Sequence, residues 1–495
     1  MTLTLTGHDY RYAVEQILLM MYPAEKPRYD ATEPSGLSAC VTLTFGGTYA
    51  VAVTHIVSDK GRFRGTSRAR RALLTDKLTT DRLLQKIIKL SFFKAATAET
   101  GKSPVWGALT GIRPGKLATA LFESGRTEHH IRGVYTREYG AMPERASLCI
   151  DTARAALLVK KTLCEKDVAL YIGIPFCPTR CHYCSFVSHS VEKSMKLIVP
   201  FLDALMHEIN ALSQTVRALG LRIIAVYIGG GTPTTLSPEA LEQLMQTLGR
   251  SLDLSGVREY TVEAGRPDTI TPEKLSVLRR NGAGRISINP QTMSNDVLHA
   301  IGRRHSSEDV LEAMRQARKS RFDAVNMDLI AGLPGDTEQG FRESLDSVLT
   351  LSPENVTVHT LSLKKGTRVT LEQTSIPGAG AVSGMLDYAE KTLRGAGYRP
   401  YYLYRQKFMS GGFENVGWCR PGMESLYNIL IMEELCTILA LGGGGVTKLV
   451  RPETGRIERI FNYKYPYEYI DHQERVAADK SRIEAFYRTA WPSVL

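Results

Sequence analysis

The sequence predicts an α/β protein whose central part is a parallel sheet of six βα units, curled into a partial barrel. Short apolar segments alternate with amphipathic helices over residues 168–395, which is typical of a parallel sheet covered by helices. Six units are fewer than a closed barrel uses, so we expect one open side. The chain of 495 residues also exceeds one ordinary core. We therefore expect an N-terminal α+β domain at 1–165, the barrel at 166–400 and a C-terminal extension at 401–495.

The N-terminal domain is predicted from elements that do not alternate regularly. Residues 1–21 carry an apolar helical face and predict a first helix, and charged residues within this stretch exclude the core of a secretion signal. Two β-rich segments, 37–45 and 49–57, flank a pair of glycines and predict a hairpin. Further helices are expected at 80–95, 116–123 and 143–163.

The densest basic cluster of the chain follows this hairpin. It spans residues 60–71, which contain no acidic residue. We interpret it either as a solvated loop or as a nucleic-acid footprint. The formal net charge of +11 likewise suits several anions, among them nucleic acid, an anionic membrane surface and a polycarboxylate substrate. Charge alone does not choose among them.

The barrel is predicted element by element. Its strands are expected at 169–174, 223–228, 259–263, 285–288, 324–330 and 355–361. Its helices are expected at 195–219, 238–248, 272–281, 307–319, 337–349 and 382–395. The fold of the residues after about 400 cannot be inferred from the pattern.

Polar residues gather where these strands end. In a parallel βα fold the loops after the strands meet on one face, and ligands bind there. A cysteine cluster follows the first strand and a glycine run follows the second. At or near the ends of the other four lie Glu263, Gln291, Asp328, His359 and Ser362. Charged residues such as Glu263, Arg303 and Asp328 are most often rim ion pairs, but their positions favour a ligand with amine, carboxylate and hydroxyl groups.

The cysteine cluster has an unusual spacing. Cys177, Cys181 and Cys184 are separated by three residues and then two, and a nearby fourth cysteine of the ferredoxin type is missing. Three thiolates can ligate three irons of a 4Fe-4S cubane and leave the fourth iron open, as a catalytic cluster requires. The alternative is a zinc site completed by His182 or His189, but there is no second cysteine pair to form zinc hairpins.

Two glycine runs invite a phosphate-binding interpretation. The run at residues 229–233 (GGGTP) lacks both the dinucleotide fingerprint and the phosphate-loop lysine. It is either an ordinary turn or, in the context of the cysteine loop, a place where the backbone approaches a ligand closely. The run at 442–445 has the wrong spacing for a phosphate loop and no clear strand before it, so we expect a flexible loop.

The remaining cysteines and the hydropathy bear on location. Isolated cysteines are typical of a reducing compartment and not of a disulfide framework. No run of about 18 apolar residues is present, so no membrane span is expected. We therefore expect a cytoplasmic protein. The isolated cysteines are Cys40, Cys149, Cys164, Cys419 and Cys436.

Residues 171–177 (YIGIPFC) resemble the oxygen-independent coproporphyrinogen III oxidase family of radical S-adenosylmethionine enzymes. The segments 229–234 (GGGTPT) and 326–334 (NMDLIAGLP), together with Glu263 and Gln291, are similar to successive motifs of that family. Three flanking segments resemble its HemZ-type branch and extend the similarity over nearly the whole chain. They are 110–114 (TGIRP), 288–291 (INPQ) and 413–418 (FENVGW).

The resemblance implies a radical SAM partial barrel, a 4Fe-4S cluster on Cys177, Cys181 and Cys184, and S-adenosylmethionine as second cofactor. It also implies a reduced flavodoxin- or ferredoxin-type electron donor and a porphyrinogen or haem tetrapyrrole as partner. The implied S-adenosylmethionine contacts are Tyr171, Tyr183, Gly230, Gly231, Thr232, Glu263, Gln291, Arg303, Asp328 and Ser362.

The implied reaction is the oxidative decarboxylation of coproporphyrinogen III to protoporphyrinogen IX by a 5'-deoxyadenosyl radical. One departure from the pattern is Phe186, which stands where the decarboxylating branch has a further cysteine. In this respect the chain resembles relatives that handle haem without decarboxylation, so a haem chaperone is the alternative. An RNA-modifying radical enzyme is disfavoured because no RNA-binding module is recognisable.

Overall fold

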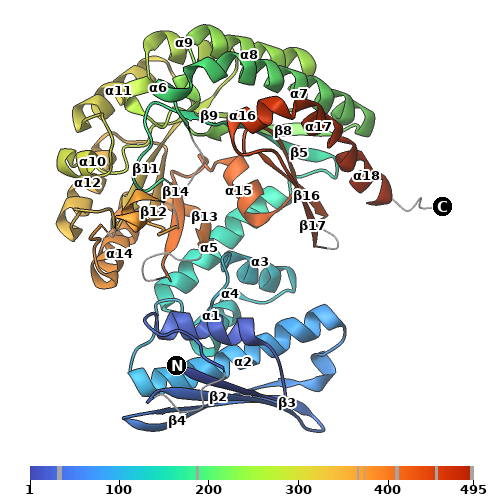
Figure 1. The fold of residues 1–495 in the computed structure, drawn as a ribbon, viewed down its shortest axis with the longest axis vertical. Helices are drawn as coiled ribbons and strands as arrows, with labels where there is room; N and C mark the ends of the chain where they lie inside the picture. Colours follow the sequence, from blue (N-terminus) through green and yellow to red (C-terminus); the bar gives the residue numbers. More distant parts are fainter. Residues whose placement is uncertain are drawn as a thin grey trace. The chain divides into compact units, whose positions relative to one another are not determined.

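The computed structural model describes residues 1–29, 36–184, 189–364, 367–372, 374–406, 412–451 and 455–490 (Figure 1). The chain forms two compact units, 1–150 and 151–495, that divide within helix α5 (Pro143–Lys160). The division into three domains with boundaries at residues 165 and 400 stays a prediction. No helix in the described ranges is long and apolar enough to cross a membrane.

The first unit is a four-stranded sheet with helices on one face. The predicted hairpin is confirmed as an antiparallel pair, and the strand at Thr2–Thr6 joins it in parallel. The strand order is β1 (Thr2–Thr6), β2 (Ser38–Phe45), β3 (Tyr49–Ser58) and β4 (Gly61–Arg70). The helices are α1 (Arg11–Met21), α2 (Lys77–Thr100), α3 (Gly115–Glu123) and α4 (Glu128–Gly133), with α5 following.

Two predictions in this unit were wrong. The helix expected at 1–21 begins only at Arg11, because Leu3 and Leu5 alternate with threonines and this period of two specifies a strand. The basic cluster is not a loop but strand β4, whose arginines are exposed while Gly65 and Ala69 are buried. A Cβ on Gly65 would lie only 1.9 Å from the Ser91 carbonyl oxygen, so α2 packs directly on this strand.

The second unit contains the predicted parallel sheet. All six expected strands are present and pair as parallel neighbours in chain order, which confirms the α/β fold class. The strands are almost entirely buried, as is typical of a parallel sheet. The strands are β5 (Asp167–Ile174), β8 (Arg222–Gly230), β9 (Glu259–Glu263), β10 (Arg285–Ser287), β11 (Ala324–Ala331) and β12 (Asn355–Thr360).

Helices cover this sheet as an outer arc (Figure 1). Most begin at a Ser or Thr whose side chain accepts a hydrogen bond from a backbone N–H of the first turn, as Ser237 and Thr271 do. Both of those helices carry proline at their first position, which suits a helix start. The helices are α7 (Ile198–Leu219), α8 (Pro238–Ser251), α9 (Pro272–Arg280), α10 (Asn295–Ala300), α11 (Ser307–Lys319), α12 (Glu338–Thr350) and α14 (Ala379–Gly395).

The residues after 400 extend the same sheet at both edges. Beyond β12 lie the antiparallel strands β14 (Glu414–Cys419) and β13 (Arg399–Arg405). At the other edge β15 (Thr437–Gly442) pairs in parallel with β5, and an antiparallel pair follows. The rest comprises β16 (Val446–Arg451), β17 (Arg456–Phe461), α15 (Leu426–Glu433), α16 (Pro466–Asp471), α17 (Gln473–Ala478) and α18 (Ser481–Ala490).

The glycine run at 442–445 is therefore a turn between two strands, and the expectation that no strand precedes it was wrong. Gly442 has a φ of 81°, and a Cβ there would lie 2.3 Å from the carbonyl oxygen of Gly173. Glycine is required because β15 passes so close to β5 at this point. The buried Glu208 of α7 accepts a hydrogen bond from the Gly442 N–H at 2.8 Å and pairs with Lys480, which anchors this turn.

Candidate functional site

The cysteine loop leaves the carboxyl end of β5. Cys177 lies in the short strand β6 (Phe176–Cys177), which pairs with β7 (His189–Ser190). Cys181 and Cys184 follow in the intervening loop. All three cysteines are partly exposed, and none of them forms a disulfide bond. Phe186 lies outside the described residues. The pairing of β6 with β7 therefore holds the two ends of the loop together.

The glycine run packs against this loop. A Cβ on Gly231 would lie 2.5 Å from the Phe176 carbonyl oxygen and 3.0 Å from Cys177 Sγ. The buried Thr232 has its Oγ1 3.4 Å from the same sulfur. Gly230 has a φ of 109°, a conformation that favours glycine. The glycines thus bring this backbone close to the cysteine loop, and its close approach to a ligand stays a prediction.

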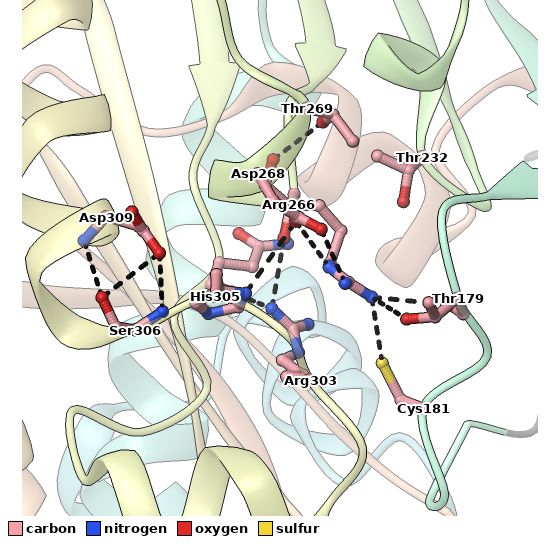
Figure 2. A network of polar contacts seen from close by, with 12 residues as sticks. Thr179, Cys181, Thr232, Arg266, Asp268, Thr269, Arg303, His305, Ser306 and Asp309 are labelled. Atoms are coloured by element: carbon pink, nitrogen blue, oxygen red, sulfur yellow. Dashed lines mark hydrogen bonds and ion pairs between the residues drawn. The ribbon is translucent and has the colours of Figure 1, made fainter.

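A buried arginine holds the cysteine loop from the other side (Figure 2). Arg266, 3% exposed, follows β9 and donates from Nε and Nη2 to the two carboxylate oxygens of Asp268, at 3.0 and 2.9 Å. Its Nη1 donates to Thr179 Oγ1 at 3.1 Å and reaches Cys181 Sγ at 3.7 Å. The guanidinium thus links strand β9 to one sulfur of the loop.

Arg303 and His305 lie next to this guanidinium (Figure 2). Arg303 donates to the Asn289 carbonyl oxygen at 2.6 Å and to Tyr183 Oη at 3.1 Å, so it holds the Tyr183 side chain of the cysteine loop in place. Burial and the cations of Arg303 and Arg266 lower the pKa of His305 to about 3, which keeps its ring neutral. Both ring nitrogens of His305 are buried and form no hydrogen bond among the described residues; Nδ1 lies 4.0 Å from Asp268 Oδ1.

Glu263 ends β9 within a cluster of tyrosines. Its Oε1 accepts a hydrogen bond from Tyr227 Oη at 2.6 Å, and Tyr227 stacks on Tyr427 with ring centroids 4.5 Å apart. Tyr171 stacks beside both rings. Burial in this cluster, together with the nearby charge of Asp328, raises the pKa of Glu263 to about 7. Glu263 is consequently poised to change charge near neutral pH.

Asp328 behaves in the opposite way. Burial alone would favour its protonated form, but hydrogen bonds from His359 and Asn326 lower its pKa below the usual value. His359 Nε2 lies 3.6 Å from Asp328 Oδ2, and Asn326 Nδ2 donates to Asp328 Oδ1 at 2.7 Å. Two carboxylates in one sheet thus have pKa values pushed apart, which is common where charged ligands bind.

Gln291 and Ser362 have buried polar atoms without partners. Gln291 has a φ of 72°, a strained conformation for a side chain of this size, and its Oε1 is unpaired among the described residues. Its backbone is fixed on β11, since its N–H donates to the Asp328 carbonyl oxygen at 2.9 Å. Ser362 Oγ is likewise buried and unpaired in the described ranges. Unpaired buried groups are rare, and a polar ligand would satisfy both.

The zinc alternative does not fit the histidines. His182 Nδ1 lies 3.0 Å from the Ala300 carbonyl oxygen, and its Nε2 lies 2.8 Å from Arg368 Nη1. Both ring nitrogens are therefore occupied. His189 packs edge-on against Tyr465 and Tyr467. No three His, Cys, Asp or Glu side chains of the described ranges converge on one ion, whereas a cubane takes each thiolate on a different iron.

The structure thus brings most of the predicted residues together in three groups along consecutive strand ends. The first group is Tyr171, Gly230 and Glu263; the second is Cys177, Gly231 and Thr232; the third is Tyr183 and Arg303. Asp328 and Gln291 are joined through their backbones, and the Ser362 hydroxyl forms no hydrogen bond to any described residue. Sequence reasoning missed Arg266, Asp268, His305, Tyr227 and Tyr427; for Arg266 the signal was its place just after a strand end.

A fold and site of this kind define a radical SAM protein, and the sequence pattern of the Radical SAM superfamily matches residues 171–348. Over 402 residues, 80% of either sequence, the chain is 39% identical to the oxygen-independent coproporphyrinogen-III oxidase-like protein HemZ of Bacillus subtilis (strain 168). The chain belongs to the oxygen-independent coproporphyrinogen III oxidase family of radical SAM proteins, in its HemZ-type branch. Its cofactors are a 4Fe-4S cluster and S-adenosylmethionine.

The chain is also similar to heme chaperones and to one solved structure of an oxidase. Heme chaperone HemW of Bacillus subtilis is 37% identical over 199 residues, 40% of this chain and 51% of the chaperone. Heme chaperone HemW of Escherichia coli is 28% identical over 325 residues, 64% of this chain and 81% of the chaperone. The structure of coproporphyrinogen III oxidase HemN from Escherichia coli matches with a TM-score of 0.52 at 21% identity, covering 66% and 73% of the two chains. The last likeness concerns the fold.

Proposed function

We propose that the chain is a radical SAM oxidoreductase that decarboxylates two propionate groups of coproporphyrinogen III to give protoporphyrinogen IX without oxygen. The observation that carries this is the 39% identity over 80% of both chains to a relative named as coproporphyrinogen-III oxidase-like. The net charge of +11 also suits a substrate with four carboxylates. When bound, the cofactors would supply a 5'-deoxyadenosyl radical that takes a hydrogen from each propionate, after which CO₂ and one electron, passed to an acceptor, leave a vinyl group.

We assign the cluster to Cys177, Cys181 and Cys184. Three observations support this: the sulfurs form no disulfide bonds, a glycine leaves room beside Cys177, and a buried guanidinium faces Cys181. Donors that point at thiolate sulfur stabilise the reduced, more negative cluster. A reduced flavodoxin- or ferredoxin-type protein is the electron donor in this proposal.

We assign S-adenosylmethionine to the strand ends that follow. The ionised carboxylates of Glu263 and Asp328 would attract the amine and accept hydrogen bonds from ribose hydroxyls, while Arg303 would complement a carboxylate. The unpaired atoms of Gln291 and Ser362 supply further polar contacts. The remaining contacts in this assignment are Tyr171, Tyr183, Gly230, Gly231 and Thr232.

A second candidate is a haem chaperone of the same fold. It is favoured by the similarity to proteins named heme chaperone HemW and by Phe186, which replaces a cysteine of the decarboxylating branch. Such a protein would keep the cofactors but hold an intact porphyrin.

Anaerobic turnover separates the two candidates. The reconstituted protein with reductant, S-adenosylmethionine and coproporphyrinogen III should form vinyl product in step with 5'-deoxyadenosine, and a Cys181→Ala variant should form neither. Cleavage of S-adenosylmethionine without vinyl product, together with stoichiometric haem binding, would replace the oxidase by the chaperone. A Phe186→Cys variant that gains vinyl product would identify that residue as the difference.

A further inference from the structure

A pocket of about 260 Å³ is lined entirely by residues of the first unit. The function proposed above uses no residue of this unit. One face of α2 forms one wall, and the loop that begins the TGIRP segment at 110–114 forms another. The polar residues that line it are Arg82, Lys86, Lys89, Thr110, Gly111 and Tyr139. Three cations thus face one small space.

The cations come from one side of the helix. Arg82, Lys86 and Lys89 are spaced by four and three residues, so their side chains are neighbours on the helix surface. Like charges at this spacing destabilise a helix unless something neutralises them. An anion bound between these side chains would reduce their mutual repulsion.

Among the described residues of the first unit, one carboxylate pairs with these three groups. Lys86 Nζ lies 2.8 Å from Glu138 Oε1 and 5.2 Å from the centre of the Tyr139 ring. Lys89 Nζ donates to two neutral oxygens, at 2.7 Å to Gln16 Oε1 and 2.9 Å to Thr110 Oγ1, and has no ion pair with a described residue. The Arg82 guanidinium has no hydrogen bond or ion pair among the described residues. The charges of Arg82 and Lys89 are therefore left without a counter-ion in the part of the unit that the structure describes.

Burial makes this deficit costly at Lys89. Its side chain is half-buried, and burial lowers its pKa because the charged form loses water without gaining a negative partner. An oxyanion in the pocket would offset that loss. The Gly111 backbone N–H, which donates no hydrogen bond within the described residues, would be a further donor at the pocket wall.

We propose that this pocket binds a small oxyanion, a phosphate or carboxylate group, between Arg82 and Lys89. A guanidinium offers paired N–H donors to such a group and an ammonium offers a point charge, and both suit oxyanions. The volume is below the roughly 300–1,000 Å³ of sites for drug-sized ligands, so the pocket takes a small group and not a whole tetrapyrrole. The site is independent of the radical chemistry.

Calorimetric titration of the full chain tests the proposal. Inorganic phosphate and succinate are titrated separately at constant ionic strength, with chloride as the balancing anion. We expect saturable binding of one probe per chain, and the probe that binds distinguishes a phosphate from a carboxylate ligand. Lys89→Gln and Arg82→Gln should each weaken binding roughly tenfold or more, because each removes a charge-assisted hydrogen bond.

The matched control is Lys94→Gln on the same helix. Lys94 is exposed and donates to the Thr66 carbonyl oxygen at 3.0 Å, outside the pocket, so its loss should leave binding unchanged. Arg82 is exposed and free, so Arg82→Gln keeps the fold even if Lys89→Gln does not. The proposal is overturned if neither probe saturates, or if Lys94→Gln weakens binding as much as the two pocket variants.

Discussion

The two large sheets of the molecule differ in the burial pattern along their strands. In the first unit β3 alternates between buried and partly exposed positions along nearly its whole length, since one face of the sheet lies under helices. In the second unit β5, β8 and β12 are buried almost without interruption. Exposure is thus ordinary in the first sheet and exceptional in the second.

The exceptions in the second sheet are informative. Within these otherwise buried strands, the partly exposed interior positions include Tyr171, Tyr227 and His359, and Asn326 and Asp328 interrupt β11 in the same way. Each of them takes part in the polar and aromatic clusters around Glu263 and Asp328. In a sheet whose strands are otherwise buried, a partly exposed polar residue is a candidate for a binding site. In the alternating sheet it marks only the outer face.

The largest expected effect is at the cysteine loop. Alanine at Cys177, Cys181 or Cys184 should abolish the 4Fe-4S cluster, because only three ligands hold it. Cys40 on β2 provides the control in the other sheet, and Cys40→Ala should leave iron binding intact. Iron analysis and absorbance after anaerobic reconstitution measure both. A cluster that survives all three loop substitutions would refute the assignment.

Arg266 comes next. Arg266→Gln removes the main ionic partner of Asp268 and the donor at Cys181. Arg266 is buried but Asp268 is partly exposed, so the loss should cost about 1–3 kcal/mol, between the values for exposed and for buried pairs. We expect that loss in denaturant unfolding, and a more negative cluster reduction potential in an EPR-monitored titration.

The exposed pair of Arg279 with Asp323 is the matched control for Arg266. Arg279→Gln should cost less than about 1 kcal/mol and leave the cluster potential unchanged. If the two variants shift the potential equally, the contact with Cys181 has no electronic role.

Glu263 should impose a pH dependence on cofactor binding. With a pKa of about 7, its carboxylate ionises as the pH rises, so affinity for S-adenosylmethionine should increase roughly tenfold from about pH 6 to about pH 8. The raised pKa also means that this group's contribution to stability is lost as the pH rises from about 4.5 to about 7. Equilibrium binding across this range, with Glu263→Gln as the variant that should lose the dependence, measures the effect.

The smallest effect is expected on the outer face of the first sheet. Arg64 is exposed on β4 and has no ion pair or hydrogen bond among the described residues, so Arg64→Gln should change the free energy of unfolding by no more than about 0.5 kcal/mol. The opposite is expected of Gly65→Ala on the same strand, because its Cβ would collide with the backbone of α2. Thermal unfolding of both variants tests whether exposure in this sheet is neutral.

The sequence by itself determined the six parallel strands, most of their helices and the three cysteines. Those features depend on local periodicity and on short spacings, which a chain displays without being folded. It also located Glu263, Gln291 and Asp328 at strand ends, because parallel strands direct their carboxyl ends to one edge.

Only the tertiary structure decided the rest. Strand β15 pairs with β5 across more than two hundred residues of chain, and no local pattern encodes that partnership. The same holds for Arg266 beside Cys181 and for the tyrosines around Glu263, whose contacts join separate strands and loops. The raised pKa of Glu263 and the lowered pKa of Asp328 follow from those neighbours, since burial and nearby charges exist only after folding.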